Sequence, residues 1–332
     1  MHVFGLALPS MSSVTTVRLG HPFQALQSLG VLTRIGIGEL EIKENDEPGV
    51  LILYRAYLNN HSIITVLSSL IEKGWLIIND IDDDLIDRHD FKRENFFCLR
   101  YVHAVTVSTP RLAEMLTQYN PNTYVLPNAV PNLSDVNKKD NSICRIFFGA
   151  LNRYKDWCSI KDTVVEALSE LDNLIEFIVV HDRQVFDDLP ESIPRRFYST
   201  LPFDDYFSLL SQCHISLLPL NLTRFNLAKS DLKFIESCAA GCVPIFSPVV
   251  YGEIPIHRVI GLLANEPFEW KASLKSLVLT KIERERRLHL GREYVSTCRL
   301  HSHQAISRLS LYQSLLSRRA DLERQRIERF VN

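Results

Sequence analysis

Short apolar runs alternate with longer amphipathic stretches along most of the 332-residue chain. Apolar runs between turn-forming residues are typical of buried strands. In the first half they predict strands at His2–Leu8, Val50–Tyr54, Trp75–Ile78, Ala104–Val107 and Tyr124–Leu126. In the second half they predict strands at Ile143–Phe148, Ile175–Val180, Phe197–Ser199, Ile215–Leu218, Val243–Phe246 and Val259–Leu263. Because strands that alternate with helices form parallel sheets, we expect an α/β protein with two Rossmann-like domains that face a cleft.

Helical spacing of apolar residues fills the intervals between these strands. It predicts helices at Arg18–Leu29, Ile63–Glu72, Arg93–Tyr101, Asp204–Cys213 and Leu232–Ala239, with further helices beginning at Thr109-Pro110 and ending at Leu171. After the last predicted strand the chain is helical to its end. Pro127–Pro131 breaks the pattern, and the polar stretch Ser134–Ser142 follows. We therefore expect one domain over residues 1–130, a second over 131–310, and a C-terminal helix over 311–332.

The composition narrows the class of protein. Hydrophobic residues make up 46% and charged residues 23%, with a net charge of −2, which suits a soluble enzyme and gives no basic footprint for nucleic acid. The seven cysteines are scattered, which favours a reducing compartment over a disulfide framework. Cys238 and Cys242 lack a second Cys/His pair that would complete a zinc site. No apolar run approaches the roughly 20 residues of a membrane span, and no signal-peptide pattern is present, so we expect a cytoplasmic protein.

Polar residues follow one predicted strand after another. They are Arg55, Asp80–Asp84, Ser108, Gly149–Lys155, His181-Asp182 and Asn226–Glu236. Parallel sheets bind ligands at the carboxyl ends of their strands, so these residues indicate a shared ligand site. His181 is the only histidine that we place in this site, and the Gly-x-Ser-x-Gly motif of a nucleophilic serine is absent.

The acidic run Asp80-Ile81-Asp82-Asp83-Asp84 has four interpretations. Carboxylates at alternating positions can bind a divalent cation. A strand followed by Asp-x-Asp also begins phosphatases of the haloacid dehalogenase type, but those enzymes have Thr or Val where Asp84 stands. The run can instead form the edge of a cleft, with one carboxylate acting as a base or binding hydroxyl groups. It can also be a solvated turn that caps the next helix.

The stretch Asn226–Gly252 places five polar residues within eight positions and then becomes apolar. Its polar members include Lys229, Ser230, Asp231, Lys233 and Glu236. Leu232 and Ile235 begin the apolar stripe of a helix, and Gly241 is a suitable end for it. The free N–H groups and positive dipole at the start of this helix suit a phosphate, to which Lys229 would add a charge. The alternative is a surface helix with solvated charges.

Gly149–Lys155 also lies between a strand and a helix. It lacks the spaced glycines of a dinucleotide-binding loop and the Gly-Lys-Ser/Thr of a P-loop. Arg153 and Lys155 nevertheless suit a diphosphate, with two solvated cations at the start of a helix as the equal alternative.

Taken together, these motifs resemble the GT-B class of nucleotide-sugar glycosyltransferases, in the retaining group that includes many bacterial polysaccharide enzymes. A strand, Gly149 and then Lys155-Asp156 is similar to the opening of the donor domain in that class. Ile215–Leu220 is similar to its apolar strand that ends in Pro. Lys229–Glu236, followed by Ala239–Ile245, resembles its donor helix. In the first half, Asp80–Leu85, Val107-Ser108-Thr109 and Pro127-Asn128 resemble its strand ends and its linking segment.

The resemblance assigns a role to Glu236 and also shows departures from the usual pattern. In that class a Glu at the position of Glu236 binds the ribose hydroxyls. A second Glu usually stands eight residues earlier, where this chain has Ala228. Lys229–Asp231 replaces a Gly-rich turn, and Ser10–Thr16 replaces an N-terminal glycine loop.

The activity that the resemblance implies is transfer of a sugar from a nucleoside diphosphate sugar to an acceptor hydroxyl, without a tightly bound metal or cofactor. The predicted donor-binding residues are Glu236, Lys229, Ser230, Asp231, Lys233, Asn226, Arg153, Lys155, Gly149 and His181. The predicted catalytic residues are Asp82 and Asp83, with Arg18 and Arg55 on the acceptor side. The implied partners are the nucleotide sugar and a glycan or lipid-linked glycan acceptor, in polysaccharide or glycan synthesis, and no nucleic acid.

Two other classes of function stay open. One is a non-catalytic nucleotide- or sugar-binding module on the same fold, which the missing Glu at Ala228 favours. The other is a nucleotide-sugar epimerase. The basic run Arg318–Arg329 predicts a solvated helix, and its alternatives are a brace for the first domain or a contact with the inner face of an anionic membrane.

Overall fold

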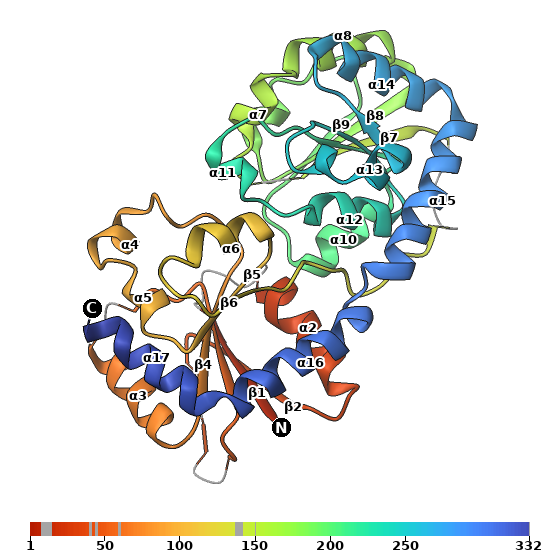
Figure 1. Ribbon diagram of the computed structural model, residues 1–332. Helices are drawn as coiled ribbons and strands as arrows, with labels where there is room; N and C mark the ends of the chain where they lie inside the picture. The colour runs from red at the N-terminus through yellow and green to blue at the C-terminus, as the bar shows by residue number, and fades with distance from the viewer. Residues whose placement is uncertain are drawn as a thin grey trace. The chain divides into compact units, whose positions relative to one another are not determined.

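The chain forms two compact units in the computed structural model, which describes residues 1–7, 15–39, 42–43, 46–58, 61–136, 142–149 and 151–331 (Figure 1). Unit 1 contains Met1–Ala129, Ala228–Ser230 and His301–Asn332, and unit 2 contains Val130–Leu227 and Asp231–Leu300. The chain thus passes back into unit 1 for three residues at Ala228, a return that the expected domain ranges did not include. It enters unit 1 for the last time at His301.

Unit 1 is built on a six-stranded sheet with the order β2-β1-β3-β4-β5-β6. Its strands are β1 (His2–Ala7), β2 (Leu32–Ile37), β3 (Val50–Tyr54), β4 (Leu76–Ile81), β5 (Ala104–Val107) and β6 (Thr123–Val125). Every pairing is parallel. β3, β4 and β5 are buried along their whole length, which explains their continuous apolar sequences. The order reverses between β1 and β3, so the carboxyl ends of these strands are the expected ligand position in this sheet.

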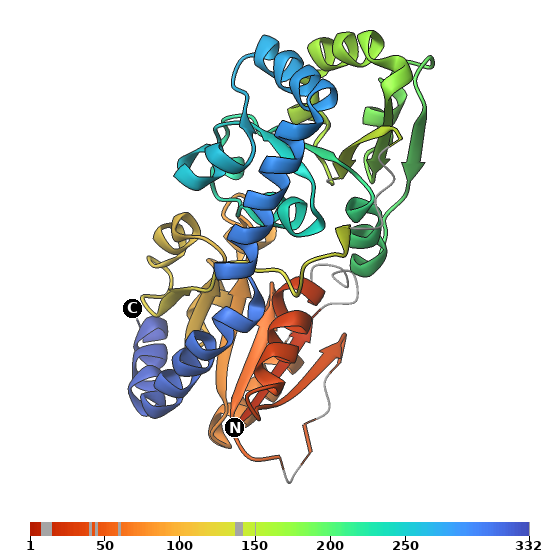
Figure 2. The ribbon, with the colours of Figure 1, turned by 90° about the vertical axis from the view of Figure 1, so that its right-hand side faces the viewer.

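Helices cover both faces of this sheet. They are η2 (Thr16–Gly20), α2 (His21–Gln27), α3 (His61–Glu72), α4 (His89–Arg93), α5 (Phe97–Arg100), α6 (Pro110–Leu116), α16 (His301–Ser317) and α17 (Arg319–Val331). Phe23 of α2 and Tyr312 of α16 belong to one buried cluster, and Leu67 of α3 and Leu112 of α6 belong to another. α16 packs on α2, and α17 packs on α5. Figure 2 shows both C-terminal helices, in blue, beside the orange strands of this unit.

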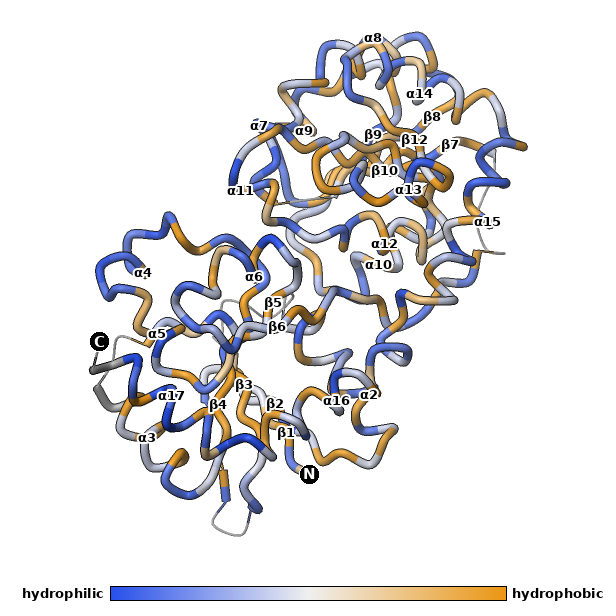
Figure 3. Tube along the Cα trace, viewed as in Figure 1, coloured by the Kyte–Doolittle hydropathy of each residue, from blue (hydrophilic) through white to orange (hydrophobic). Residues whose placement is uncertain are grey.

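Unit 2 has a second six-stranded parallel sheet, with the order β12-β11-β10-β7-β8-β9. Its strands are β7 (Cys144–Gly149), β8 (Ile175–Val180), β9 (Arg195–Tyr198), β10 (Ile215–Leu218), β11 (Val243–Phe246) and β12 (Leu262–Leu263). The order reverses between β7 and β10, which again marks a ligand position at their carboxyl ends. The apolar strands lie inside both units, as the orange segments in Figure 3 show.

The helices of unit 2 lie between these strands in the sequence. They are α7 (Tyr154–Cys158), α8 (Lys161–Glu170), η4 (Asp172–Leu174), α9 (Arg183–Asp187), α10 (Phe203–Ser211), α11 (Arg224–Leu227), α12 (Leu232–Ala240), η5 (Tyr251–Glu253), α13 (Pro255–Ile260), α14 (Pro267–Leu279) and α15 (Lys281–Cys298). α12 ends as the sequence predicts, because Gly241 adopts the left-handed conformation with φ of 76°. Two buried clusters form the core of this unit, one containing Trp157 and Trp270 and the other Phe234 and Phe246.

The structure differs from the predicted elements in three places. We did not predict β2, since its sequence LTRIGI mixes polar and apolar residues and it lies at the edge of the sheet. The strand expected at Val259–Leu263 is mostly helix α13, which Pro255 begins, and only its last two residues pair with β11. The helix expected at Arg93–Tyr101 breaks at Asn95 and Phe96, both of which have positive φ. Leu8 and most of the segment Ser10–Thr16 lie outside the described residues.

Candidate functional site

Four residues that we expected at a donor site meet in unit 2, near the carboxyl ends of β7 and β8. The Oε2 atom of Glu236, which is 2% exposed, accepts a hydrogen bond of 2.9 Å from Lys233 Nζ. Lys233 Nζ also donates to the Tyr206 hydroxyl at 3.0 Å and lies 4.1 Å from the centre of that ring. The Tyr206 hydroxyl donates to the carbonyl oxygen of Gly149 at 3.3 Å. The His181 ring stacks on Tyr206, with the ring centroids 6.3 Å apart.

Burial and the ion pair together set the charges of this cluster. Burial alone would lower the pKa of Lys233, but Glu236 and Tyr206 together outweigh it, so the pKa is raised and Lys233 stays charged. Burial raises the pKa of Tyr206, which keeps the phenol neutral. Burial, followed by the nearby Lys233, lowers the pKa of His181. At neutral pH the cluster therefore holds one ammonium–carboxylate pair beside a neutral phenol and a neutral imidazole.

A second cluster in unit 2 follows β7 and is organised by Asp156, which is buried. Its carboxylate accepts hydrogen bonds from Arg153 Nη1 at 2.8 Å, from Asn226 Nδ2 at 2.9 Å and from the backbone N–H of Asn221 at 2.8 Å. Arg153 also donates to Asn226 Oδ1 at 2.8 Å. The side chain of Lys155 is exposed, and no carboxylate among the described residues pairs with it. Arg153 and Asn226 thus fix one another, whereas Lys155 is an open cation in the first turn of α7.

Asp231 stands just before α12 and is held by an ion pair. Arg299 binds its carboxylate through two nitrogens, with Nη2 at 2.7 Å from Oδ1. His257 Nε2 lies 3.6 Å from the same carboxylate, and its ring stacks on Phe234 with centroids 3.6 Å apart. Burial lowers the pKa of His257 to about 4. These contacts anchor the start of α12, so Asp231 does not present an open carboxylate.

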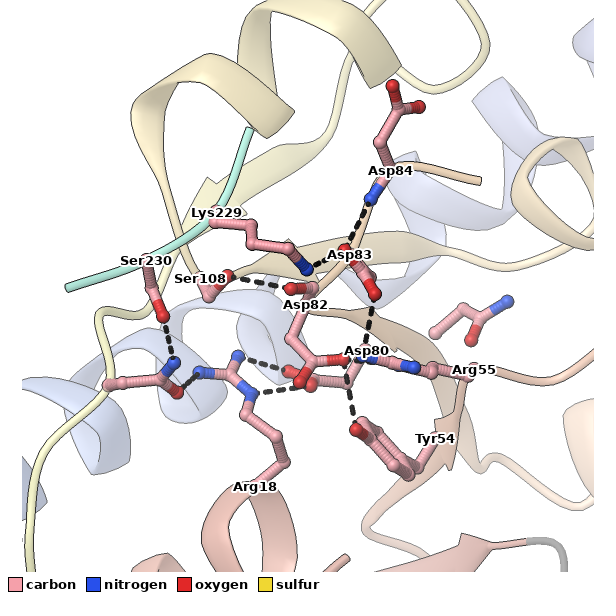
Figure 4. A network of polar contacts seen from close by, with 12 residues as sticks. Arg18, Tyr54, Arg55, Asp80, Asp82, Asp83, Asp84, Ser108, Lys229 and Ser230 are labelled. Atoms are coloured by element: carbon pink, nitrogen blue, oxygen red, sulfur yellow. Dashed lines mark hydrogen bonds and ion pairs between the residues drawn. The ribbon is translucent and has the colours of Figure 1, made fainter. Parts of the chain in front are cut away.

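The acidic run of unit 1 begins with a fully buried ion pair (Figure 4). Arg18 binds Asp80 through Nε and Nη2, both at 2.8 Å, and Thr106 donates a further hydrogen bond to Asp80 at 2.6 Å. Arg18 Nη1 donates to the carbonyl oxygen of Leu126 and to Asn128 Oδ1. Since Arg18 is 1% exposed, any direct contact with an acceptor would require this pair to open.

Asp82 and Asp83 lie in the next part of the same network (Figure 4). Asp82 accepts hydrogen bonds from the Tyr54 hydroxyl, at 2.9 Å, and from Arg55 Nε. Asp83 lies 3.6 Å from Arg55 Nη2 and 3.1 Å from Lys229 Nζ. The structure therefore brings together four predicted site residues in unit 1, and it pairs both predicted catalytic carboxylates with cations.

Asp84 has a different role from its neighbours. Its Oδ1 accepts a hydrogen bond from the backbone N–H of Ile86 at 2.9 Å, which closes a local turn. Asp84 is buried and the next helix begins at His89, so this residue is not a solvated helix cap. No group of three or more His, Cys, Asp or Glu side chains in the described part of the chain could hold a metal ion. The cation-binding interpretation of the acidic run is not supported.

The segment Ala228–Ser230 belongs to unit 1. Ala228 is completely buried in the cluster that contains Leu112, and its carbonyl oxygen accepts a hydrogen bond from the Thr109 hydroxyl at 3.1 Å. Ser230 Oγ accepts a hydrogen bond from Asn128 Nδ2 at 2.7 Å. The position at which the resemblance expects a Glu is thus part of a packed core, where a carboxylate would be buried.

Strained backbone marks several of these strand ends. Six described non-glycine residues have positive φ. Arg55 follows β3 and His181 follows β8 directly, with φ of 47° and 79°, while Asn152 lies three residues after β7. Val250, with φ of 66°, follows β11 by four residues. Such conformations are disfavoured for side chains other than glycine and concentrate at functional sites, so they are consistent with ligand positions at these edges.

Three residues of the site were not predicted to act in it. Tyr206 lies in an amphipathic helix whose pattern gives no hint of a polar contact, and Asp156 and Arg299 find partners 70 and 68 residues away in the sequence. Pairings over such distances leave no local signal in a single sequence.

Comparisons with known proteins identify the fold. No protein-family model matches the sequence, and no curated protein matches it. Solved structures do match. WaaG, a glycosyltransferase involved in lipopolysaccharide biosynthesis, is 13% identical with a TM-score of 0.57, over 92% of this chain and 98% of that one. HepE from Anabaena in complex with UDP is 12% identical with a TM-score of 0.61, over 95% and 100%. An alpha-glucosyltransferase in complex with UDP-glucose and DNA containing an abasic site is 10% identical with a TM-score of 0.69, over 94% and 99%.

This chain has the GT-B glycosyltransferase fold. The two six-stranded parallel sheets and the C-terminal helices confirm the predicted fold class. At identities of 10–13% the matches establish the fold and leave the roles of individual residues as predictions.

The C-terminal helix of this GT-B fold braces unit 1. Leu322 is completely buried, and Arg329 donates hydrogen bonds to the carbonyl oxygens of Arg100 and Val102. Arg326 pairs with Glu323 at 2.7 Å. Part of the basic run Arg318–Arg329 is therefore committed to the unit rather than solvated. No helix in the described part of the chain has the length and apolar character needed to cross a membrane.

Proposed function

We propose that this protein transfers a sugar from a nucleoside diphosphate sugar to an acceptor hydroxyl. The observation that carries this proposal is the pair of polar clusters in unit 2, which follow β7 and β8 of a GT-B fold matched over at least 92% of its length. A buried carboxylate at Glu236 and an exposed cation at Lys155 are the chemistry that a ribose and a diphosphate require. Two of the matching structures contain UDP or UDP-glucose, so a uridine nucleotide is the first donor to test.

On the donor side, Glu236 accepts hydrogen bonds from ribose hydroxyls and Lys155 binds the diphosphate. Gly149, Arg153 and Asn226 shape the start of α7, which carries Lys155. Lys233 holds Glu236, and His181 lies beside them. Lys229, Ser230 and Asp231 precede α12, and Lys229 is a second candidate for the diphosphate. Stabilisation of the leaving diphosphate by these cations would lower the barrier to transfer.

On the acceptor side, we assign Asp82 and Asp83 to the acceptor hydroxyl, with Arg55 and the Arg18–Asp80 pair holding them in place. A glycan or a lipid-linked glycan is the proposed acceptor, in polysaccharide synthesis. The reaction needs no tightly bound metal or cofactor, and chelation with EDTA should leave activity unchanged. We place the protein in the cytoplasm, with peripheral contact at the inner face of a membrane as an alternative.

Nucleoside diphosphate binding tests the donor site. UDP, ADP and GDP at millimolar concentration should raise the melting temperature, with one of the three most effective. Lys155→Ala should weaken this nucleotide by about 10- to 100-fold, since a charge-assisted phosphate contact is worth about 1.5–3 kcal/mol. Lys281→Ala, which removes an exposed lysine from α15, is the matched control and should bind normally. If none of the nucleotides shifts the wild-type melting temperature, the donor site is wrong.

Lys229→Ala separates two roles for that residue. If Lys229 leaves Asp83 to bind the diphosphate, the variant should lose nucleotide binding as Lys155→Ala does. Unchanged nucleotide affinity in Lys229→Ala would restrict Lys229 to its ion pair with Asp83.

A second candidate is a binding module without transferase activity. It is favoured by Ala228, because the packed core around this residue leaves no place for the sugar-contacting Glu of retaining enzymes. A panel of nucleotide sugars distinguishes the two functions. Diphosphate release that depends on an acceptor supports transfer, whereas tight binding without release under any acceptor supports the module.

A further inference from the structure

Tyr206 is the centre of the Glu236 cluster and has no role in the function proposed so far. Its hydroxyl accepts a hydrogen bond from Lys233 Nζ at 3.0 Å and donates one to the Gly149 carbonyl oxygen at 3.3 Å. Its ring lies under the same ammonium at 4.1 Å and stacks against His181. Lys233 therefore meets Tyr206 through both the hydroxyl and the ring face.

Lys233 needs such a partner because it is the cation that compensates the buried carboxylate of Glu236. Glu236 is 2% exposed, and Lys233 Nζ is its only hydrogen-bond donor among the described side chains. A buried carboxylate is costly without a cation. A lysine, however, is a point charge on a flexible four-carbon chain, and an (i, i+3) pair on a helix is weak by itself. The cation–π contact and the hydroxyl of Tyr206 supply the missing constraint.

The end of β7 fixes the position of Tyr206 in turn. A Cβ atom at Gly149 would lie 2.3 Å from the Phe147 ring and 3.0 Å from the Tyr206 ring, so only glycine allows this approach. The Phe147 and Tyr206 rings meet edge to face at 5.5 Å and 74°. Because the Tyr206 proton points to the Gly149 carbonyl, the oxygen lone pair is left for the ammonium. The contacts thus run from β7 through Tyr206 and Lys233 to Glu236.

We propose that Tyr206 is a positioning residue for the ribose: by holding Lys233 it orients the carboxylate of Glu236. This inference rests on the proposed function, in which Glu236 accepts the ribose hydroxyls. Lys233 occupies Oε2, and Oε1 has no partner among the described residues, so Oε1 is the oxygen that faces the ligand. Tyr206 acts only on ligands that carry ribose hydroxyls.

The test compares a nucleoside diphosphate with its 2′,3′-dideoxy counterpart. UDP, ADP and GDP, each with its dideoxy form, are titrated by calorimetry against wild-type protein and Tyr206→Phe. Wild type should bind the ribose form of its nucleotide more tightly than the dideoxy form. Tyr206→Phe should lose about five- to tenfold for the ribose form, the value of about one hydrogen bond, and less than about twofold for the dideoxy form. Phenylalanine keeps the ring, so the packing on Phe147 is retained.

Further variants test whether Tyr206 changes ribose binding through Lys233. Lys233→Met should resemble Tyr206→Phe in selectivity, and the double variant should be no worse than Lys233→Met alone, because residues that act in series are not additive. Lys233→Arg should restore part of the preference for ribose. Tyr198→Phe removes a tyrosine hydroxyl that accepts a hydrogen bond of 3.5 Å from Arg196 on the edge strand β9 of the same unit, and it should leave both affinities unchanged.

The outcomes are distinct. Equal losses for the ribose and dideoxy forms would show that Tyr206 supports the fold only and would overturn the proposal. Unchanged binding of the ribose form in Tyr206→Phe would overturn it as well. Wild-type protein that binds none of the nucleotides would instead refute the donor site itself, and the positioning role would fall with it.

Discussion

Three buried cations in this protein are each held by an ion pair with a carboxylate. Arg18 binds Asp80, Arg299 binds Asp231, and Lys233 binds Glu236. Burial would lower the pKa of each cation, but in each case the partner carboxylate and a neighbouring tyrosine together outweigh this effect and raise the pKa. Such pairs hold a geometry even where they add little net stability, because breaking one leaves an uncompensated charge.

Removing one member of the most deeply buried pair should therefore be severe. Asp80→Asn leaves Arg18 without an anion at 1% exposure, and we expect a loss of about 3–5 kcal/mol in the free energy of unfolding. The exposed pair Arg183–Asp187 provides the control, since Asp187→Asn should cost less than about 1 kcal/mol. Urea unfolding of the two variants measures the difference. Equal costs would show that the buried pair is not a structural requirement.

The identities of these charged residues could be read from the sequence, but their partners could not. Arg18 begins a predicted helix, Asp231 precedes another, and Lys233 and Glu236 lie in the first turns of the latter, which is why they were placed at a site. Arg18 and Asp80 are 62 residues apart, and Asp231 and Arg299 are 68 apart, so the pairings depend on the completed sheets. The local (i, i+3) pair of Lys233 and Glu236 is the one that helical spacing can suggest.

Among the elements, α17 shows how a charged sequence can be an integral part of a fold. Asp321, Arg324 and Glu328 are exposed, yet Leu322 is completely buried and Gln325 accepts a hydrogen bond from Asn122 at 2.7 Å. Arg326 lies over the Tyr101 ring at 5.0 Å. The sequence indicated a helix here, but it did not favour the brace over the solvated helix, because one buried leucine is a weak signal.

Leu322→Ala tests the contribution of this helix. Truncating a fully buried leucine should lower the free energy of unfolding by about 3 kcal/mol. Ile327→Ala, on the same helix but 50% exposed, should change it by less than about 1 kcal/mol. Chemical unfolding followed by circular dichroism measures both. A small effect of Leu322→Ala would mean that α17 is loosely attached.

Continuous apolar strands were the most predictable elements, and edges were the least. β3, β5 and β8 match their predicted positions, since buried parallel strands need unbroken apolar runs. β4 continues through Asp80 to Ile81, beyond the predicted end at Ile78. β2 and β12 lie at sheet edges, where only one side of the strand is paired, and their sequences carry little of this signal. The three residues Ala228–Ser230 were assigned to the second domain by sequence continuity, and only the contacts of the folded chain place them in unit 1.

For the molecule as a whole, neutral buried histidines in both units predict loss of stability in acid. Burial lowers the pKa of His257 in unit 2 to about 4, and burial and the nearby Arg308 lower that of His301 in unit 1 to about 2. Burial also lowers the pKa of His103. In the unfolded chain these residues titrate near 6.5, so their stabilising contribution is complete above that pH. This contribution is lost as the pH falls below about 6.5, because the unfolded state then binds protons that the folded state does not bind.

The expected slope is about 1.4 kcal/mol per pH unit for each such histidine. Urea unfolding at pH values from 7.5 to 5 should show it, and His257→Gln should make the dependence shallower by about one histidine. His289→Gln, at an exposed position, should not change it. A wild-type protein with constant stability over this range would contradict the neutral state of these residues.

The chain passes between the two units more than once. This determines which unit is the first to have all of its residues available for folding during synthesis on the ribosome. Unit 2 has all of its residues once Leu300 has emerged, although it begins more than a hundred residues after unit 1. Unit 1 holds the first strand of the protein but must wait for α16 and α17, whose Tyr312 and Leu322 close its core. Until then the face of its sheet that bears Val3 and Ile52 is covered only by η2 and α2, through residues such as Phe23. The part of the protein that is made first is thus the last to be able to fold, and a nascent chain stalled before His301 would expose an unfinished sheet to chaperones.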